Sequence, residues 1–214
     1  MEKNNLPLAI THCRDTEFRW GERTYVMGVI NLSPDSFSGD GISNIQAAQA
    51  QARRFIAEGA DIIDIGGEST RPSSKPVSID EELRRVIPAI ERLADELPAP
   101  ISIDTYKSAV AIRALVAGAS MINDVWGLKQ DQRLAQIAAD AGVPIILASN
   151  QRDKPCDDIM PEVISSLKRS ITLAREAGVA EQDIIIDPGI GFGKSLEQNL
   201  EIIRRLAELK SLAR

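Results

Sequence analysis

Six short runs of apolar, mostly β-branched residues recur along the chain, and stretches with helical periodicity separate them. Because these runs are nearly continuous in Ile, Val and Leu, they predict strands that are buried on both faces of a parallel sheet. No linker or low-complexity tract interrupts the pattern, so residues 1–214 are predicted to form a single domain. The predicted strands are Tyr25–Asn31, Ala60–Gly67, Pro100–Thr105, Ser120–Val125, Val143–Ser149 and Asp183–Asp187.

Two capping boxes, each a Ser followed three residues later by Glu or Gln, predict helix starts. An apolar stripe of helical spacing follows each box. The first box is Ser78 and Glu81 with the stripe Leu83, Val86, Ile87, Ile90 and Leu93, and the second is Ser195 and Gln198 with Leu196, Leu200, Ile203 and Leu206. We expect the charged run Glu81, Glu82, Arg84 and Arg85 to form a solvated helix face. Lys107 is expected to be exposed in the first turn of a helix.

The strict alternation of strands and helices predicts a parallel sheet with right-handed crossovers. Two architectures fit this alternation: a (β/α)₈ barrel of the TIM type, or an open doubly wound sheet. Polar residues at the carboxyl end of every predicted strand favour the barrel, because a barrel gathers all these ends on one face. Only six βα units are present, so we expect the chain to stop about two units short of a complete barrel. Residues 1–24 are predicted to form an N-terminal arm with a small hairpin within Leu8–Thr24.

Composition and charge narrow the class of protein. With 43% hydrophobic and 26% charged residues, the chain has the composition of an ordinary globular domain. A net charge of -6 argues against a nucleic-acid or anionic-membrane surface. Cys13 and Cys156 form no C-x-x-C motif, and the start of the chain lacks the apolar segment of a signal peptide. We therefore expect a cytoplasmic protein.

The polar groups at the strand ends predict a small-molecule site. Asn31, Asp64, Asp104, Asn123 and Asp187 all lie in or directly after predicted strands. Buried carboxylates are costly unless they are paired or hydrogen-bonded, so several that point into one barrel mouth suggest a ligand rich in N–H donors. A pterin or guanine edge presents such donors side by side.

A structural role is an equally good interpretation of any single strand-end aspartate, because Asp often caps a helix. This applies above all to Asp124, and Thr105 has the same alternative. The turn from Gly189 to Lys194 resembles the end of a phosphate-binding loop, but Pro188 stands where that motif requires glycine. We therefore predict no nucleotide triphosphatase activity.

Five motifs, in this order along the chain, resemble those of the dihydropteroate synthases. They are N-L-S-P-D-S-F-S, D-I-I-D-I-G-G-E-S-T-R-P, I-S-I-D-T, I-N-D-V and I-I-D-P-G-I-G-F-G-K. The resemblance implies a TIM barrel and a reaction of folate synthesis. In that reaction p-aminobenzoate displaces diphosphate from 6-hydroxymethyl-7,8-dihydropterin diphosphate, giving 7,8-dihydropteroate. It also implies that the enzyme is a target of sulfonamides.

The resemblance also implies roles for individual residues, by their positions in the motifs. It implies that Asp64, Asp104, Asn123 and Asp187 bind the pterin, and that Asn31 is linked to Mg²⁺. It implies that Asp35, Thr70 and Arg71 act in catalysis, and that Ser36, Phe37, Thr70, Arg71, Pro72 and Phe192 border p-aminobenzoate or diphosphate. Small-molecule substrates and a homodimer of the complete protein are implied as partners.

Three departures from the family pattern bear on these expectations. Ser38-Gly39-Asp40-Gly41 replaces the family's S-D-G-G, and Ala148-Ser149 stands where the family carries Met-His. A Ser-Arg-Lys strand and an Arg-x-His strand, which supply cations to the site, are not found before Arg214. The 214-residue chain alone is therefore expected to be inactive. Two alternatives to the synthase are a non-catalytic pterin-binding paralogue and a methyltransferase-type pterin barrel.

Overall fold

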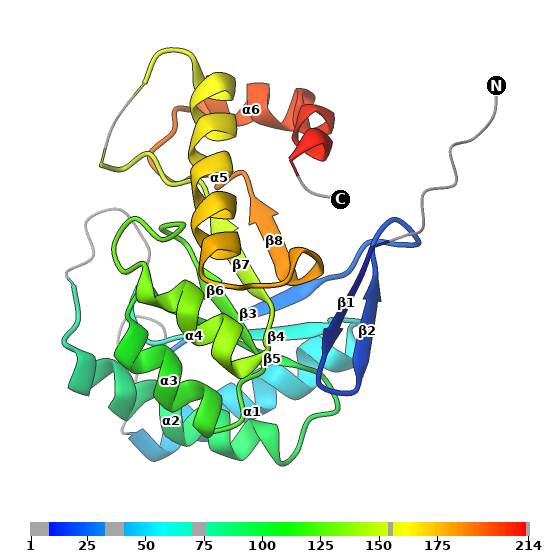
Figure 1. Ribbon diagram of the computed structural model, residues 1–214. Helices are drawn as coiled ribbons and strands as arrows, with labels where there is room; N and C mark the ends of the chain where they lie inside the picture. Colours follow the sequence, from blue (N-terminus) through cyan, green and yellow to red (C-terminus); the bar gives the residue numbers. More distant parts are fainter. Residues whose placement is uncertain (1–8, 33–40, 70–75, 154–155, 213–214) are drawn as a thin grey trace.

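The computed structural model describes residues 9–32, 41–69, 76–153 and 156–212, with no side chains for residues 41–44 (Figure 1). The chain begins with an antiparallel hairpin, which is formed by β1 (Ile10–Cys13) and β2 (Thr16–Arg19). A six-stranded parallel sheet follows. Its strands are β3 (Met27–Asn31), β4 (Ile62–Gly66), β5 (Ile101–Asp104), β6 (Met121–Asp124), β7 (Ile145–Ala148) and β8 (Ile184–Asp187).

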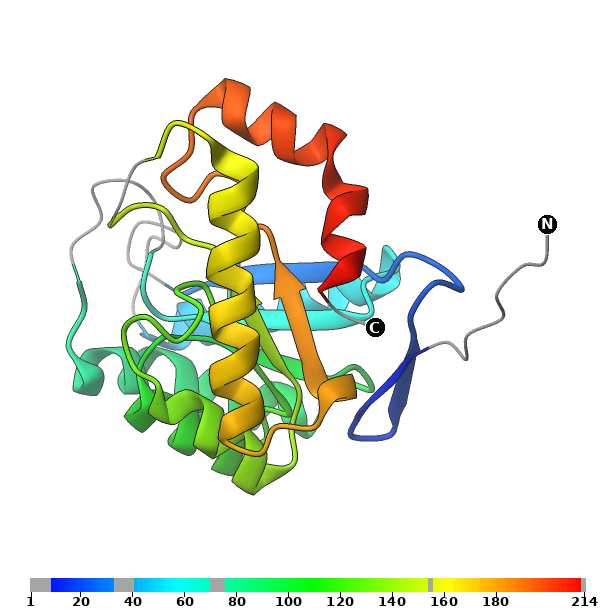
Figure 2. The same cartoon turned by 45° about the horizontal axis from the view of Figure 1, so that its top comes forward.

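The six parallel strands lie side by side in sequence order, from β3 to β8. A doubly wound sheet would reverse this order at a switch point, and a barrel does not. Each crossover carries a helix, and Figures 1 and 2 show these helices along the outside of the sheet. They are α1 (Gly41–Ala57), α2 (Ile79–Ala94), α3 (Ser108–Val116), α4 (Arg133–Ala141) and α5 (Ile159–Glu176), with the short η1 (Glu181–Asp183) after α5. The fold therefore consists of six units of a TIM-type barrel.

Burial explains why the apolar runs form this sheet. All five residues of β4 are buried. The side chains with no exposed surface include Ile63, Ile65, Ile101 and Ile103. These side chains pack between the sheet and the inner faces of α2 and α3, whose stripes bury the residues at helical spacing. The six predicted strands are confirmed, each to within two residues at either end, and so is the hairpin.

The hairpin packs against the beginning of the sheet, at the end opposite to the polar residues. Phe18 and Cys13 of the hairpin are buried against Ile62 and Met121, which are the first residues of β4 and β6. The Cys13 thiol also donates a hydrogen bond to the Ser120 carbonyl at 3.0 Å. The arm therefore covers the amino ends of the strands and leaves their carboxyl ends to the site.

The last helix differs from the prediction. The capping box of Ser195 and Gln198 is present and begins α6 (Leu196–Arg204), which the turn η2 (Leu206–Ser211) follows beyond the tip of β8 (Figure 2). The expected stripe is wrong as a core contact, since Ile202 carries the burial in α6 instead. The stripe residues are exposed: Leu196 by 69%, Leu200 by 42%, Ile203 by 55% and Leu206 by 49%.

An apolar cavity of ≈ 470 Å³ lies between β8 and η2. Ile184, Ile186, Leu206 and Leu209 contribute to its walls. Within the described residues β8 pairs with β7 alone, so one edge of β8 faces this region without a strand partner. None of the helices in the described part of the chain combines the length and hydropathy that crossing a bilayer would require.

We predict that Gly28→Ala loosens the packing of β3 on α1. A Cβ atom at this position would meet the Phe55 ring at 2.6 Å, so the ring or the strand must shift. The expected loss is about 1–3 kcal/mol in the free energy of unfolding, measured by urea denaturation. Adding Phe55→Ala removes the clash, so the double variant should lose less than the sum of the two single losses. Strict additivity would contradict this packing.

Candidate functional site

Five of the residues singled out from the sequence occupy the carboxyl-terminal half of the parallel sheet. Asn31, Asp104 and Asp187 are the last residues of β3, β5 and β8. Asn123 is the penultimate residue of β6, and Asp64 lies in the middle of β4. The other predicted site residues on loops, except Phe192, lie outside the described residues: Asp35, Ser36, Phe37, Thr70, Arg71 and Pro72.

Asp64 and Asn123 are joined directly, although β5 lies between their strands. The Asn123 side-chain amide donates to Asp64 Oδ2 at 3.1 Å. Neighbouring strands are about 4.8 Å apart, so side chains two strands apart meet only where the sheet curls inward. Asp104 pairs in register with both Gly66 and Asn123. The curved sheet therefore gathers Asp64, Asp104 and Asn123 on adjacent strands.

Burial makes ionisation of these carboxyl groups unfavourable. The Asp64 side chain is 2% exposed, and desolvation raises its pKa to about 6, although the neighbouring Ser102 hydroxyl and the Asn123 amide both act to lower it. Desolvation also raises the pKa of Asp104 well above its usual range, and the negative charge of Asp64 adds to this effect. The two groups thus form an acceptor-rich site in which negative charge is poorly compensated.

Three buried polar side-chain atoms within the described residues have no hydrogen-bond partner: Asp64 Oδ1, Ser102 Oγ and Gln151 Nε2. Asp64 and Ser102 are direct neighbours in the pairing of β4 with β5. A buried polar atom without a partner costs free energy, and such atoms recur at functional sites. The unmet acceptor on Asp64 fits a ligand that brings an N–H donor to the strand ends.

Asp124 and Asn150, which also follow or end strands, hold the local backbone through hydrogen bonds. This is the structural role that was the alternative for Asp124. Asp124 accepts hydrogen bonds from the backbone N–H groups of Trp126 and Leu128, at 2.9 and 2.7 Å. Asn150, after β7, donates to the Val125 carbonyl at 3.0 Å. These side chains are fully buried and hold the turns after β6 and β7 in place.

The turn after β8 is organised by Lys194. Its ammonium donates to the carbonyls of Ser149 at 2.7 Å and Gly189 at 2.8 Å, so it ties this turn to the end of β7. Desolvation lowers the pKa of Lys194 to about 8, an effect that Asp187 partly offsets. Asp187 itself accepts the Gly189 N–H at 2.7 Å. Gly189 has a φ of +70°, and a Cβ there would collide with the Ser149 carbonyl.

Phe192 lies in the same turn and is half-buried. The guanidinium of Arg152 sits over its ring, 4.8 Å from the centroid, which is a cation–π contact. Arg152 and Lys194 therefore bring cationic groups to the ends of β7 and β8. Neither cation was predicted as a site residue, although the polar run after the fifth predicted strand and the G-F-G-K turn were signals for them.

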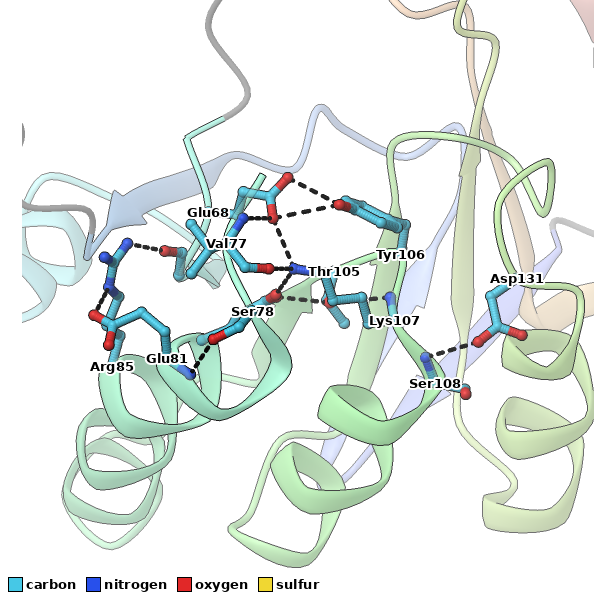
Figure 3. Close-up of polar contacts among 12 residues, drawn as sticks. Glu68, Val77, Ser78, Glu81, Arg85, Thr105, Tyr106, Lys107, Ser108 and Asp131 are labelled. Atoms are coloured by element: carbon cyan, nitrogen blue, oxygen red, sulfur yellow. Dashed lines mark hydrogen bonds and ion pairs between the residues drawn. The ribbon is translucent and has the colours of Figure 1, made fainter. Parts of the chain in front are cut away.

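A second polar cluster joins the ends of β4 and β5 (Figure 3). Lys107 contacts the carboxylates of Glu68 and Glu82 at 2.7 and 2.5 Å, and Tyr106 donates to Glu68 at 3.0 Å. The expectation that Lys107 is exposed is therefore wrong, because its side chain is 12% exposed. The solvated face predicted for the start of α2 is wrong for Glu82, which is 1% exposed, since Lys107 and Thr105 pair with it.

No group of three or more His, Cys, Asp or Glu side chains that could hold a metal ion occurs within the described ranges. Asn31 offers an amide oxygen at the carboxyl end of β3. Such hard oxygen donors suit Mg²⁺.

Comparison with known proteins gives a consistent family. The family model described as pterin binding enzyme matches residues 27–214. A dihydropteroate synthase of Bacillus subtilis is 48% identical over 198 residues, covering 92% of this chain and 70% of that protein.

Solved structures agree. A dihydropteroate synthase of Clostridium difficile, crystallised in the presence of pteroic acid, has a TM-score of 0.86 at 49% identity. The aligned region covers 91% of this chain and 75% of that synthase. That of Xanthomonas albilineans with 4-aminobenzoic acid has a TM-score of 0.89 at 42% identity, covering 96% of this chain and 75% of its own.

We predict that Asp64→Asn stabilises the fold while it weakens binding of a pterin. Folding raises the pKa of Asp64 from 3.8 to about 6, so the ionised carboxylate opposes folding above pH 6. Removing the charge should add about 2–3 kcal/mol to the free energy of unfolding at pH 8. This gain should shrink as the pH falls from 6 towards 4, because the wild-type carboxyl is then protonated.

Urea denaturation at pH 8 and pH 4.5 measures the gain, and titration calorimetry with 6-hydroxymethylpterin measures the affinity. Asp61→Asn is the matched control, since the pKa of Asp61 is lowered, chiefly by its hydrogen bond with Arg23, and its loss should cost stability instead. A variant at Asp64 that is less stable at pH 8, or that binds the pterin as well as the wild type, would contradict the assignment.

Proposed function

Because this chain belongs to the pterin-binding enzyme family, we propose that it catalyses the dihydropteroate synthase reaction of folate synthesis. The amine of p-aminobenzoate replaces diphosphate on 6-hydroxymethyl-7,8-dihydropterin, and 7,8-dihydropteroate forms. The observation that carries this proposal is the set of buried Asp64 with half-buried Asp104 and Asn123, in which Asp64 Oδ1 has no partner. The identity of 48% to a dihydropteroate synthase over 92% of the chain supports it.

The strand-end carboxylates suit the pterin ring. The ring carries an amino group next to a ring N–H, and a carboxylate accepts two such donors side by side. Asp64 and Asp104 provide acceptors, while the Asn123 amide can both donate and accept. We assign Asp187, at the end of β8, to the same ring, where its contact with Gly189 holds the carboxylate in place.

The reaction requires the protein mainly to position the two substrates and to stabilise the charge on the departing diphosphate. The C–O bond to diphosphate breaks and its electron pair leaves with the diphosphate, while the pterin ring stabilises the cation on its methylene carbon. The p-aminobenzoate nitrogen then forms the C–N bond and releases a proton. No enzyme nucleophile is needed, so binding, orientation and electrostatic stabilisation provide the rate enhancement.

The remaining residues that we assign to the reaction lie in the loops after β3, β4 and β8. We assign Asp35, Thr70 and Arg71 to catalysis, with the Arg71 guanidinium acting on the departing diphosphate. We assign Ser36, Phe37, Pro72 and Phe192, together with Thr70 and Arg71, to the surroundings of p-aminobenzoate and diphosphate. Arg152, which stacks on Phe192, adds positive charge at the same end of the sheet.

We propose Mg²⁺ as the cofactor, held by the side-chain oxygen of Asn31. Mg²⁺ keeps several waters and commonly binds through one or two protein oxygens together with substrate phosphates. A single amide oxygen at the end of β3 fits that preference. When bound, the ion would neutralise negative charge on the diphosphate.

The two alternative functions receive less support than the synthase. The relatives compared above bear the name dihydropteroate synthase, and two were crystallised with pteroic acid or 4-aminobenzoic acid. A methyltransferase-type barrel would have no use for p-aminobenzoate. Ala148-Ser149 remains the feature that motivates a non-catalytic paralogue. A homodimer of the complete protein and a cytoplasmic location stay predictions.

We predict that the chain forms 7,8-dihydropteroate when it carries two further βα units and Mg²⁺. Product formation from the two substrates, measured by chromatography, tests the 214-residue chain beside the extended chain. The extended chain should have the higher activity, because β8 has an edge without a strand partner in the described residues, beside an apolar cavity of ≈ 470 Å³. Excess chelator should abolish the activity of the extended chain. Turnover that persists in chelator would contradict the metal assignment, and no product at all would contradict the proposed function.

We predict that Arg71→Ala in the extended chain lowers kcat much more than it weakens pterin binding. A group that acts on the departing charge is needed in the transition state, so kcat and kcat/KM should fall together, by about 100-fold. Steady-state kinetics and calorimetry separate the two effects. Arg23→Ala, which removes a surface partner of Asp61, serves as the control. An unchanged kcat with a raised pterin KM would rule out this role.

A further inference from the structure

Glu68 and Val77, which lie on either side of residues 69–76, are held together by one polar cluster. The Val77 N–H donates to Glu68 Oε2 at 2.9 Å, so the residue that precedes the segment binds the residue that follows it. The Lys107 ammonium donates to the same Glu68 oxygen and to the Val77 carbonyl, both at 2.7 Å. The Lys107 side chain, which follows β5, therefore contacts both Glu68 and Val77 (Figure 3).

Lys107 is also held by a residue of α2. Its ammonium contacts Glu82 of α2 at 2.5 Å, and Glu82 accepts a second hydrogen bond from the Thr105 hydroxyl at 2.7 Å. Although burial disfavours the ammonium, its hydrogen bonds to Glu68 and Glu82 raise the pKa of Lys107. The lysine stays charged at neutral pH, and its three oxygen partners use all three of its donors.

The position of Lys107 on its own helix gives no reason for a lysine. It occupies the N-cap of α3, and its side chain makes no cap hydrogen bond. Helix N-termini favour Ser, Asp or Asn at this position, and a cation there opposes the helix dipole. What a lysine gains at this position is therefore its contact with Glu68, Val77 and Glu82.

The residue that directly follows β4, Gly67, is held by a second cation. Arg85 of α2 donates to the Gly67 carbonyl at 2.8 Å. Gly67 itself is packed so closely on α2 that a Cβ would meet Val86 at 2.8 Å. The exit from β4 is thus held to α2 at Gly67, and the entry to α2 is held to β4 through Glu68 and Lys107.

We propose that Lys107 is a positioning residue, which fixes the spacing of Glu68 and Val77 and so sets where the chain leaves β4 and where it enters α2, beside the pterin end of the site. This rests on the proposed function, in which Thr70 and Arg71, between Glu68 and Val77 in the sequence, act beside p-aminobenzoate and diphosphate. Lys107 touches neither the pterin nor the reacting atoms in this role. Its loss should therefore affect the benzoate half of the product more than the pterin half.

Lys107→Met in the 214-residue chain tests the proposal by binding alone. Calorimetry compares the affinity for 6-hydroxymethylpterin with that for pteroic acid. We expect pterin affinity to stay within twofold of the wild type, while the advantage of pteroic acid over the pterin falls at least fivefold. Hydrogen exchange of the Val77 amide, followed by NMR, should become at least tenfold faster.

Two further variants keep the result interpretable. Lys107→Met combined with Glu82→Gln removes the buried unpaired charge and should restore stability without restoring the pteroic acid advantage. Lys129→Met is the matched control for exchange, because Lys129 is similarly buried and binds the Asn150 carbonyl and Asp153 instead. It should leave exchange at Val77 unchanged.

The outcomes separate the inference from the proposed function. A wild-type chain that binds no pterin contradicts the proposed function. A wild type that binds both ligands, with Lys107 variants that keep the full advantage of pteroic acid or normal exchange at Val77, contradicts the positioning role alone. Equal losses for both ligands in the stabilised double variant would also overturn it, since they would indicate a general structural role.

Discussion

The desolvation of carboxyl groups at the strand ends is the constraint on which the site depends. Asp64 is almost completely removed from water, and one of its oxygens has no partner. Burial of a carboxylate without full compensation is unfavourable, so the folded protein holds this group with a pKa raised to about 6. A ligand that supplies N–H donors relieves this penalty when it binds. The fold therefore keeps a local cost that the pterin ring is suited to offset.

The rest of the structure arranges charge around this group. The sequential parallel order brings every strand end to one face, and the curl of the sheet lets Asn123 reach Asp64 across β5. The negative charges of Glu82 and Glu68 contribute to the raised pKa of Asp104. Lys107 pairs with both of these glutamates, so the same contact that joins Glu68 to Val77 limits the negative charge near the site.

Two cationic side chains, those of Arg152 and Lys194, lie on the side of the sheet away from Asp64 and Asp104. Arg152 and Lys194 lie at the ends of β7 and β8, whereas the acids with raised pKa values, Asp64 and Asp104, lie on β4 and β5. A ligand that is a hydrogen-bond donor at one end and an anion at the other would match this separation. The Lys194 ammonium is held by backbone carbonyls, and the Arg152 guanidinium stacks on the Phe192 ring.

Much of the fold could be predicted from the sequence, because strands buried on both faces leave a continuous apolar run. All six parallel strands, and Asp64, Asp104 and Asn123 as neighbours at their ends, follow from those runs and from the rule that parallel strands share their direction. The environment of Lys107 could not be predicted, since its partners Glu68 and Glu82 lie 39 and 25 residues away and local pattern favours an exposed helix start.

The helix α6 shows the opposite error. Its stripe has regular helical spacing, yet Leu196 and Ile203 remain exposed, because periodicity identifies an apolar face and not the surface that covers it. The unpartnered oxygen of Asp64 was also beyond the sequence, since it depends on which donors the curled sheet brings within reach. Both cases depend on contacts between distant segments.

Proton release on pterin binding tests the central claim most directly. If the pterin N–H groups bind an ionised Asp64, then binding near pH 6 must expel the proton that this carboxyl partly holds. Calorimetry with 6-hydroxymethylpterin in buffers of different ionisation enthalpy gives the number of protons exchanged. We expect release at pH 6 that diminishes towards pH 8 and is reduced in Asp64→Asn. Binding with no proton release at pH 6, or with the same release in Asp64→Asn, would contradict the account.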